Sequence, residues 1–520
     1  MAVCCGCKYA KILVGASILG IGIVLICVSN QALDLILRDN MVLSPSSQSY
    51  PMWKDLPVPL VSKMYLFNIS NANEVSAYGA KPILVEMGPY IFQEFHHKFD
   101  EVWHPDNGTV TYKQAKTWVH LSGDLDEKIT IVNVPLATLG AKIEPLPSAT
   151  KGIINMGLGF LKKEEIFIRK TVRELLFEGY DDPILDAAGL IEKLGIKMDG
   201  LTSKFGFFFG KNNTWYSDGI NNVYTGFNGL GELGRIATFN YSRTSPFYPG
   251  ACGAYAGSPD LFPPYMEDNA KQYVFNPDLC RTLELTLDNS NAKVHDTKGV
   301  EYKVSPMFFA NASVNPANAC FNPDHRQLPS GVFNASACRF GAPIYMSQPH
   351  FFQADPYYAS LLGANSTSPN ASQHETAFIF EPTSGVVMSV KARFQVNVKL
   401  DRIVELSAFK HLPMTTFLPT IWFETGVELP VALTGKMWYL GNFKVIIISL
   451  GSVMAAIGVA LLVYSFFVHF AKAVKKSSYD NIEEEDAANS TESQLPDREE
   501  NQAPLVPSLC NQVEEDQDKS

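Results

Sequence analysis

Two long apolar runs lie near the two ends of the chain and predict helices that cross a membrane. The first covers 12–28 and the second 445–470, and neither contains Lys, Arg, Asp or Glu. A helix rises about 1.5 Å per residue, so about 20 apolar residues cross the hydrocarbon core of a bilayer. The first run reaches this length by continuing to residue 33. We therefore expect transmembrane helices over 12–33 and 444–470, flanking one large loop, 34–443.

Within the loop, apolar residues recur at every second position in several short runs. They lie at 81–87, 128–134 and 378–381, and most clearly at 386–400. Such alternation, interrupted by Gly, Pro, Asn and Asp, is typical of antiparallel β structure. The stretch 150–204 has helical spacing instead, including 162–177 and two short helices at 183–188 and 188–194. The pattern predicts an α+β loop domain, a β body with a helical apex at about 150–204.

Basic residues lie outside the two apolar runs and predict the orientation of the chain. Lys8 and Lys11 precede the first run, and Lys472, Lys475 and Lys476 follow the second. Because basic residues stay on the cytosolic side, both termini, 1–11 and 471–520, are expected in the cytosol. The loop then faces the cell exterior or an organelle lumen. The alternative, that the first run is a cleaved signal peptide, lacks a small-residue cleavage site after Val28.

The cysteines and glycosylation sequons of the loop are typical of an extracellular or lumenal domain. An even set of four cysteines in an oxidising compartment predicts two disulfides, with three pairings open. The repeated Asn-x-Ser/Thr sequons predict N-linked glycans. The cysteines are Cys252, Cys280, Cys320 and Cys338, and the eight sequon asparagines are Asn68, Asn107, Asn212, Asn240, Asn311, Asn334, Asn365 and Asn370.

Three further cysteines lie at the cytosolic edge of the first span. Cys4, Cys5 and Cys7 are expected to be palmitoylated, because S-acylation is common at such positions. Their spacing would also suit zinc, but no second pair of ligands is near. Small residues recur at four-residue spacing within the spans, Ala16 with Gly20 and Gly451 with Ala455. This spacing permits close helix contact, between the spans or in an oligomer, and also occurs in ordinary membrane helices.

The acidic tail accounts for the net charge of the chain. Residues 479–520 hold thirteen acidic and two basic residues, a difference equal to the net charge of −11 for the whole chain. The loop is therefore near neutral, and nothing indicates nucleic acid as a partner. A polar, acidic segment with few aromatics is expected to be disordered, so 471–520 is predicted to lack structure.

A sorting signal lies at the start of this tail. Tyr479, Asp480, Asn481 and Ile482 form the pattern Tyr-x-x-bulky apolar residue, which clathrin adaptors bind as an extended strand. The signal lies just beyond Lys475 and Lys476. We expect a clathrin adaptor as a partner of the tail.

The sequence shows no catalytic pattern, so we expect no enzyme activity, no cofactor and no metal site. Gly229, Gly231 and Gly234 match a dinucleotide-binding pattern, but a strand-like segment follows, which favours a hairpin turn. His96 and His97 are adjacent, which points their rings apart in a strand. Neither His-Glu-x-x-His nor Gly-x-Ser-x-Gly occurs.

Several motifs resemble the class B scavenger receptor family, which includes the fatty-acid translocase and the lysosomal integral membrane protein. The longest is 338–355, which reads CRFGAPIYMSQPHFFQAD. The others are GPY at 88–90, RELLFEGYDDP at 173–183, FGFFFGKNNT at 205–214, FPP at 262–264, DLCR at 278–281 and RFQVN at 393–397. They span nearly the whole loop, and the tail signal favours the invertebrate epithelial membrane protein branch.

The resemblance implies a fold and a ligand class. The fold would be a distorted antiparallel β-barrel with a helical apex and an internal apolar tunnel, and the ligands would be lipids or lipoproteins. The disulfides would be Cys252–Cys320 and Cys280–Cys338. Asn322 stands where the family has a cysteine of a third bridge, so that bridge would be absent.

The resemblance also places lysines at the tunnel mouth. Lys162 and Lys163 lie within one or two positions of them, and Leu161 falls opposite one family lysine. A lysine beside an apolar mouth would attract a lipid headgroup. The alternative is a solvated helix face, because Glu164 and Glu165 adjoin.

The sequence is consistent with three functions. The first is a lipid-binding scavenger receptor of the plasma membrane that cycles through endosomes and lysosomes. The second is a sorting receptor that carries a lumenal protein to endosomes. The third is a two-span ligand-gated channel, which would carry more loop cysteines and a more polar second span.

Overall fold

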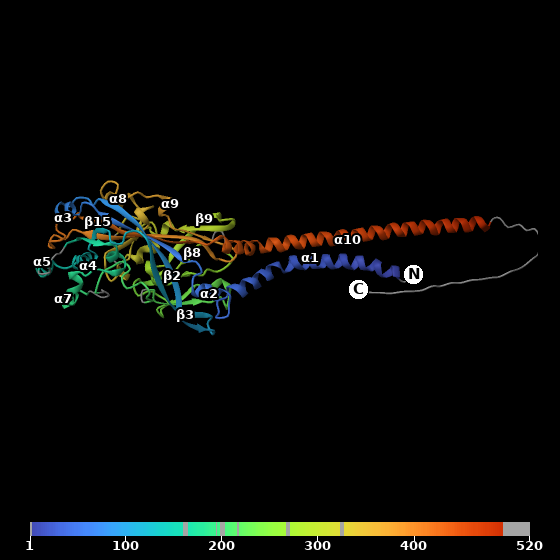
Figure 1. Ribbon diagram of the computed structural model, residues 1–520, viewed down its shortest axis with the longest axis horizontal. Coiled ribbons are helices and arrows are strands. Elements are labelled where there is room, and N and C mark those ends of the chain that lie inside the picture. Colours follow the sequence, from blue (N-terminus) through green and yellow to red (C-terminus); the bar gives the residue numbers. More distant parts are fainter. Residues whose placement is uncertain are drawn as a thin grey trace, which may run out of the picture. The chain divides into compact units, whose positions relative to one another are not determined.

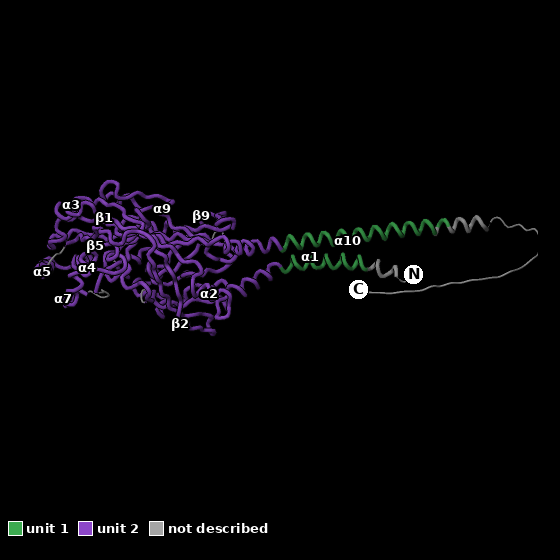
Figure 2. The backbone as a smooth tube through the Cα atoms, in the orientation of Figure 1, with its two compact units in different colours: residues 1–28, 447–520 green, residues 29–446 purple. Residues whose placement is uncertain are grey.

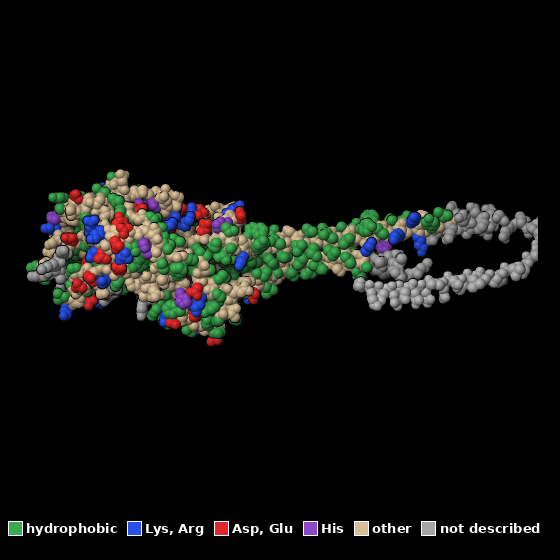
Figure 3. All heavy atoms as spheres, in the orientation of Figure 1, with side chains coloured by type: hydrophobic (Ala, Val, Ile, Leu, Met, Phe, Trp, Pro, Cys, Tyr) green, Lys and Arg blue, Asp and Glu red, His purple; other side chains and the backbone are tan. Residues whose placement is uncertain are grey.

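Two apolar helices, α1 (Val3–Met41) and α10 (Val431–Thr491), mark the ends of the folded chain. The computed structural model describes residues 3–159, 165–193, 195–197, 203–215, 218–266, 271–322 and 327–491, shown in Figure 1. Ala10–Met41 and Val431–Tyr479 are each long and apolar enough to cross a membrane. Only 17% and 11% of their most apolar windows is buried, and hydrophobic side chains cover their surfaces (Figure 3). This agrees with two spans facing lipid.

The two helices are longer than the sequence pattern predicted. The membrane spans are expected over 12–33 and 444–470, and the helices that contain them continue to Met41 and Thr491. The segment 471–491, predicted to be disordered, is therefore helical. Ala, Lys and Glu are frequent in it, and these residues have high helix propensity and extend a helix that is already formed.

Contacts divide the chain into two units (Figure 2): 1–28 with 447–520, and 29–446. The second unit is the loop domain, built on an antiparallel sheet of thirteen strands. Its main path runs β7-β6-β3-β2-β1-β15-β14-β13-β10-β9-β8, while β11 pairs with β12 and β12 with β14. The strands are β1 (Leu60–Ile69), β2 (Leu84–His104), β3 (Thr109–Ser122), β6 (Ile220–Tyr224), β7 (Ile236–Phe239), β8 (Gln272–Val274), β9 (Leu283–Val294), β10 (Thr297–Val304), β11 (Val332–Asn334), β12 (Ile344–Ser347), β13 (Ala377–Phe380), β14 (Val387–Asp401) and β15 (Thr415–Glu428).

The expected closed barrel is not formed by the described strands. The two ends of the sheet, β7 and β8, do not pair with each other. A short segment lies between them instead: Gly257 accepts a hydrogen bond from the N–H of Ile236 in β7, and the N–H of Ser258 donates to Tyr273 in β8. Gly257 has a φ of +82°, and Pro259, Pro263 and Pro264 follow. Prolines cannot donate to a ladder, so this segment cannot extend into a closing strand.

The stretch 150–204 contains short helices among its described residues, but one predicted helix is wrong. The helices of the loop domain include α4 (Val134–Ile143), α5 (Ser148–Leu158), α6 (Pro183–Asp186) and α7 (Ala188–Lys193). Within 162–177, however, the structure has a strand, β5 (Phe167–Thr171), paired with β4 (Lys128–Val132), and then a π-helix, Glu174–Glu178. Aromatic and β-branched residues suit a strand, and pairing with β4 overrides the helical spacing. The remaining helices are α2 (Ser49–Lys54), α3 (Ala72–Tyr78), α8 (Pro356–Ser360) and α9 (Ala371–His374).

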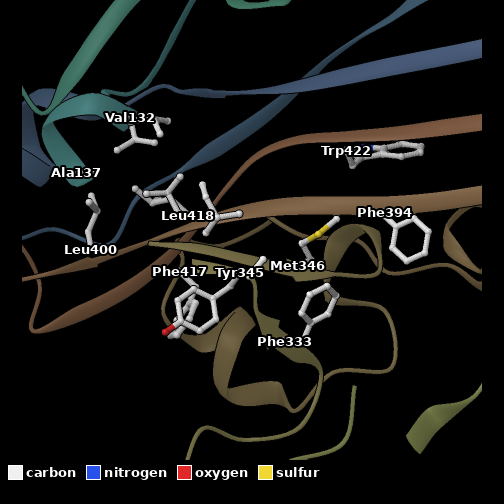
Figure 4. Packing of buried hydrophobic residues seen from close by; sticks show 14 of the residues in the cluster. Val132, Ala137, Phe333, Tyr345, Met346, Phe394, Leu400, Phe417, Leu418 and Trp422 are labelled. Carbon is white, nitrogen blue, oxygen red and sulfur yellow. The ribbon is translucent and has the colours of Figure 1, made fainter. Parts of the chain in front are cut away.

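The core lies between the sheet and the α4 region. Figure 4 shows Phe417 and Leu418 of β15, Leu400 of β14 and Tyr345 of β12 within it. The alternation predicted at 386–400 is confirmed by β14, which pairs with β15 over nearly its full length. Both long strands are buried over much of their length, which fixes their register.

Candidate functional site

Five aromatic rings from distant parts of the loop domain form what we call the aromatic cluster. They are Phe92 of β2, Trp118 of β3, Phe177 of the π-helix, Phe208, and Phe423 of β15. Ring centroids lie 5.0 Å apart for Phe92–Phe177, 5.6 Å for Phe177–Phe208 and 6.3 Å for Phe208–Phe423. All except Phe92 are only partly buried, so apolar ring surface remains accessible.

Backbone hydrogen bonds and a glycine, Gly179, hold the segment that carries Phe208 against the π-helix region. The N–H groups of Phe207 and Phe208 donate to the carbonyls of Leu175 and Leu176 in the π-helix region, both at 2.8 Å. A Cβ on Gly179, whose φ is +71°, would lie 2.8 Å from the Phe209 ring. Close packing of the two segments therefore requires glycine here, and it presents Phe208 to Phe177. The motif at 205–214 thus supplies part of the cluster.

The aromatic cluster lies where two core clusters meet. The larger core packs around β14, β15 and α4, and the smaller one around β1, β2, β4 and the π-helix. Phe205, Val396 and Phe423 are partly buried and pack against both. Accessible apolar surface between two packed cores suits an elongated apolar ligand.

A buried carboxylate borders the aromatic cluster. Glu94 is 5% exposed and accepts hydrogen bonds from Trp118 Nε1 at 3.0 Å and from Ser62 Oγ, while its Oε1 lies 2.7 Å from His96 Nε2. Burial alone would raise the pKa of Glu94, but the hydrogen bond and charge of His96 and the charge of Lys116 outweigh it. The pKa is held below its ordinary value, so Glu94 stays ionised and fixes the Trp118 ring.

A network of five charged residues lies next to Glu94. Lys211 Nζ lies 2.7 Å from Asp278, Lys116 Nζ lies 3.2 Å from Asp218 and 3.6 Å from Asp278, and Arg339 lies 3.9 Å from Asp278. Burial would raise the pKa of Asp278, but the three cations hold it well below its usual value. The network ties β3 to the disulfide-bonded segment.

Lys211 joins this network to the aromatic cluster. Its Nζ lies 5.9 Å from the Phe208 ring centroid, within cation–π range. One end of the accessible apolar surface therefore carries the ammonium group of Lys211, which is paired with Asp278. A molecule with an apolar chain and a polar headgroup matches this arrangement chemically.

A second polar group connects β2, β15 and the turn before α8. Glu86 accepts hydrogen bonds from Trp422 Nε1 and His350 Nε2, both at 2.6 Å. The rings of His350 and His374 stack with centroids 4.4 Å apart. Burial, and then the charge of His350, lowers the pKa of His374 to about 4. His374 is therefore neutral at both neutral and mildly acidic pH.

The catalytic and metal patterns of the sequence do not assemble a site. His96 pairs with Glu94 and the exposed His97 with Asp55, so the adjacent rings point apart as expected. Gly229, Gly231 and Gly234 lie in the turn between β6 and β7, which confirms the hairpin prediction. Over the described ranges, no group of three or more His, Cys, Asp or Glu residues could hold a metal ion.

Comparisons with known proteins show the family of the chain. The family model of the CD36 family matches residues 13–469. The chain belongs to the CD36 family. It is 30% identical to protein peste of Drosophila melanogaster over 75% of this chain and 69% of that protein. Its identity to scavenger receptor class B member 1 of Cricetulus griseus is 29%, covering 79% of this chain and 80% of that receptor. Sensory neuron membrane protein 2 of Heliothis virescens is also 29% identical, over 88% of this chain and 95% of that protein.

The structure joins the four loop cysteines as the CD36-family resemblance implied. Cys252 pairs with Cys320 and Cys280 with Cys338. Asn322 lies directly after the 3₁₀ turn that carries Cys320. The first bridge joins the segments around 252 and 320, and the second attaches the segment around 280 to the motif at 338–355, next to the charge network.

The sequon asparagines differ in their exposure. The half-buried Asn68 accepts a hydrogen bond from the N–H of Thr130, and the half-buried Asn311 donates one from Nδ2 to Leu328. Asn334 is 7% exposed. The exposed sequon asparagines are Asn107, Asn212, Asn240, Asn365 and Asn370.

Other predicted site residues lie elsewhere or outside the described ranges. Lys162 and Lys163 fall in 160–164, outside the described residues. Cys4, Cys5 and Cys7 belong to α1, but their side chains are not described. Tyr479 and Ile482 lie on α10 and are 63% and 53% exposed.

The sequence reading missed the aromatic cluster as a site. Only the repeated Phe and Gly of 205–214 pointed to it. Phe177 and Trp118 lie far from that motif along the chain, and their contacts depend on the β2–β3 register and on the π-helix. Neither feature has a pattern that a single sequence reveals.

Proposed function

We propose that this CD36-family member is a two-span receptor that binds lipids or lipoprotein lipids at its loop domain. The observation that carries the proposal is the partly exposed aromatic cluster between two packed cores, with Lys211 at one end. Each buried CH₂ group of a lipid chain would contribute about 0.8 kcal/mol. Some relatives are named scavenger receptors, which supports uptake as the outcome.

Passage of the lipid through an internal apolar tunnel is part of this proposal. Phe205, Val396 and Phe423 pack against both cores, so a tunnel would run along them. Lys162 and Lys163 remain proposed residues of its mouth, where they would attract the headgroup.

Replacing one ring tests the site. Phe208→Ser removes the ring that contacts Phe177, Trp118 and Phe423. Burying a Phe side chain contributes about 1.5–3 kcal/mol, and 1.4 kcal/mol is tenfold in affinity, so affinity for fluorescent fatty-acid and sterol analogues should fall at least about tenfold. Titration of the purified full chain in detergent measures this.

The matched control is Phe227→Ser. Phe227 is 66% exposed and lies outside both core clusters that contain the aromatic cluster, so its loss should leave affinity unchanged. The conservative Phe208→Leu should retain most of the affinity. Equal affinities for Phe208→Ser and Phe227→Ser would contradict the proposed site.

Uptake would use the signal at 479–482. Tyr479 and Ile482 are exposed, but α10 is helical there, so an adaptor that binds an extended strand would have to unwind this stretch. In this account the protein lies in the plasma membrane, cycles through endosomes and lysosomes, and keeps both termini in the cytosol. Tyr479→Ala should increase the surface level measured by antibody labelling of intact cells, and an unchanged level would argue against this signal.

A second candidate is a sorting receptor that carries a lumenal protein. Its support is the apolar surface of α5 and α7, where Ile153, Met156 and Leu190 are 60%, 66% and 63% exposed. Exposed apolar residues on surface helices suit a protein partner. Unchanged lipid affinity in Phe208→Ser together with an unchanged surface level in Tyr479→Ala would favour this candidate.

A further inference from the structure

A cleft of about 520 Å³ lies in the loop domain, apart from the aromatic cluster. It is bounded by α4, by the segment 334–345 and by the end of β14, and Tyr345, Phe409, Glu144, Lys399 and Asp401 are among its lining residues. Gly140 allows one wall to form, because a Cβ there would lie 2.6 Å from the Phe409 ring. The volume is in the range of about 300–1,000 Å³ that small-molecule sites occupy.

Asn334 presents a polar atom to this cleft. The residue is 7% exposed and lines the cleft. Its Oδ1 accepts a hydrogen bond from the N–H of Ser336 at 2.9 Å, and its carbonyl accepts one from the Tyr248 hydroxyl. Among the described residues, Nδ2 has no hydrogen-bond partner, and it is not one of the enclosed unpartnered atoms. Asn334 therefore lines the cleft with an amide group whose Nδ2 is neither hydrogen-bonded nor fully enclosed.

The sequence around this atom supplies an occupant. Asn334, Ala335 and Ser336 form a sequon, and Nδ2 is the atom to which an N-linked glycan is attached. We propose that the cleft holds the first N-acetylglucosamine units of a glycan on Asn334, which thereby forms part of the folded structure. The apolar faces of the sugar would pack against Tyr345 and Phe409. Its hydroxyl and amide groups would bond with Glu144, Lys399 and Asp401.

Attachment has to precede folding, because Asn334 is buried in the folded chain. A lumenal transferase moves the glycan to Asn334 from a lipid-diphosphate-linked oligosaccharide, which is the donor. The bond from Nδ2 to the sugar C1 forms as the C1–O bond to the diphosphate breaks, and one Nδ2 proton leaves. The remaining N–H stays available inside the cleft. This inference does not depend on lipid binding.

Native deglycosylation tests the seating of the glycan. The full chain, expressed in eukaryotic cells and purified in detergent, is treated with peptide N-glycosidase F, and site occupancy is followed by peptide mass spectrometry. We expect Asn334 to be occupied and its glycan to be released at least about tenfold more slowly than that of exposed Asn370, a factor equivalent to an opening cost of about 1.4 kcal/mol. After denaturation the two rates should agree. An unoccupied Asn334, or equal native rates, would overturn the proposal.

A pair of variants tests whether the glycan supports the fold. Ser336→Ala removes the sequon but keeps the backbone N–H that bonds Asn334, while Ser336→Thr keeps the sequon. We expect a lower melting temperature for Ser336→Ala only. Ser372→Ala, which removes the exposed sequon at Asn370, is the control and should match wild type. Equal melting temperatures for both Ser336 variants would overturn the structural role, and if Ser336→Ala does not fold while Ser336→Thr does, that role is supported.

Discussion

The charge states of buried residues in the loop domain depend on their local electrostatic contacts, which differ from one site to the next. Glu94 and Asp278 are held ionised by cations and hydrogen bonds, although burial opposes their charge. His374 is held neutral by the same burial. The sequence shows each of these residues but not their partners, because Glu94 meets Ser62 and Asp278 meets Lys116 only across strands and loops distant along the chain.

His374 should make the loop domain less stable at acidic pH. Its pKa is about 4 in the folded state and about 6.5 when unfolded, so between these values the unfolded chain binds more protons. The free energy of unfolding should therefore fall as pH drops through this window, by about 2 kcal/mol between pH 7 and pH 5. Urea denaturation of the full chain in detergent at both pH values measures this contribution.

His374→Asn is the matched variant for this measurement. An Asn oxygen can accept the hydrogen bond that His374 Nδ1 now accepts from the N–H of Asn370 at 2.9 Å. The variant should lose that part of the pH dependence. If wild type and variant weaken equally from pH 7 to pH 5, His374 does not have the pKa shift described above.

At the scale of elements, long regular patterns were predictable and short or irregular ones were not. The alternation at 386–400 gave β14, and the run at 445–470 gave a spanning helix, because each pattern is long enough to outweigh local exceptions. The stretch 162–177 was expected to be helical and contains β5 and a π-helix. The strand β5 is stabilised by its pairing with β4, and the local spacing of apolar residues does not reveal this pairing.

Glycines also decide how the two spanning helices meet. A Cβ on Gly22 would lie 2.6 Å from the Gly451 carbonyl, and a Cβ on Gly458 would lie 2.6 Å from the Leu19 nitrogen. The sequence suggested Ala16 and Gly20 for the first helix, but a Cβ on Gly20 meets nothing within 4 Å. Spacing alone does not say which face of a helix meets its neighbour.

Gly451→Leu should separate the two spans. The added side chain would clash with backbone atoms of the first helix, at a cost of about 1–3 kcal/mol. The melting temperature of the full chain in detergent should fall. Gly20→Leu is the control and should leave it unchanged, so equal losses in both variants would contradict the helix contact.

At the scale of the whole molecule, one CD36-family chain combines two apolar helices long enough to span a membrane, an open thirteen-stranded sheet and several short helices. Figure 1 labels these elements, and Figure 2 colours the two compact units of the chain. The sheet is not a closed barrel, yet Gly257 and Ser258 bond to both of its end strands. An apolar interior ligand would contact the aromatic cluster and the residues shared by the two cores.

Binding of an apolar ligand inside the loop domain is the property on which the proposed function depends. The direct measurement is photocrosslinking of the full chain with a diazirine-bearing fatty acid, followed by peptide mass spectrometry. We predict crosslinks on Trp118, Phe177, Phe208, Val396 or Phe423, all reduced by excess unlabelled fatty acid. Crosslinks confined to exposed residues such as Met156 and Leu190, or unaffected by competitor, would contradict the account.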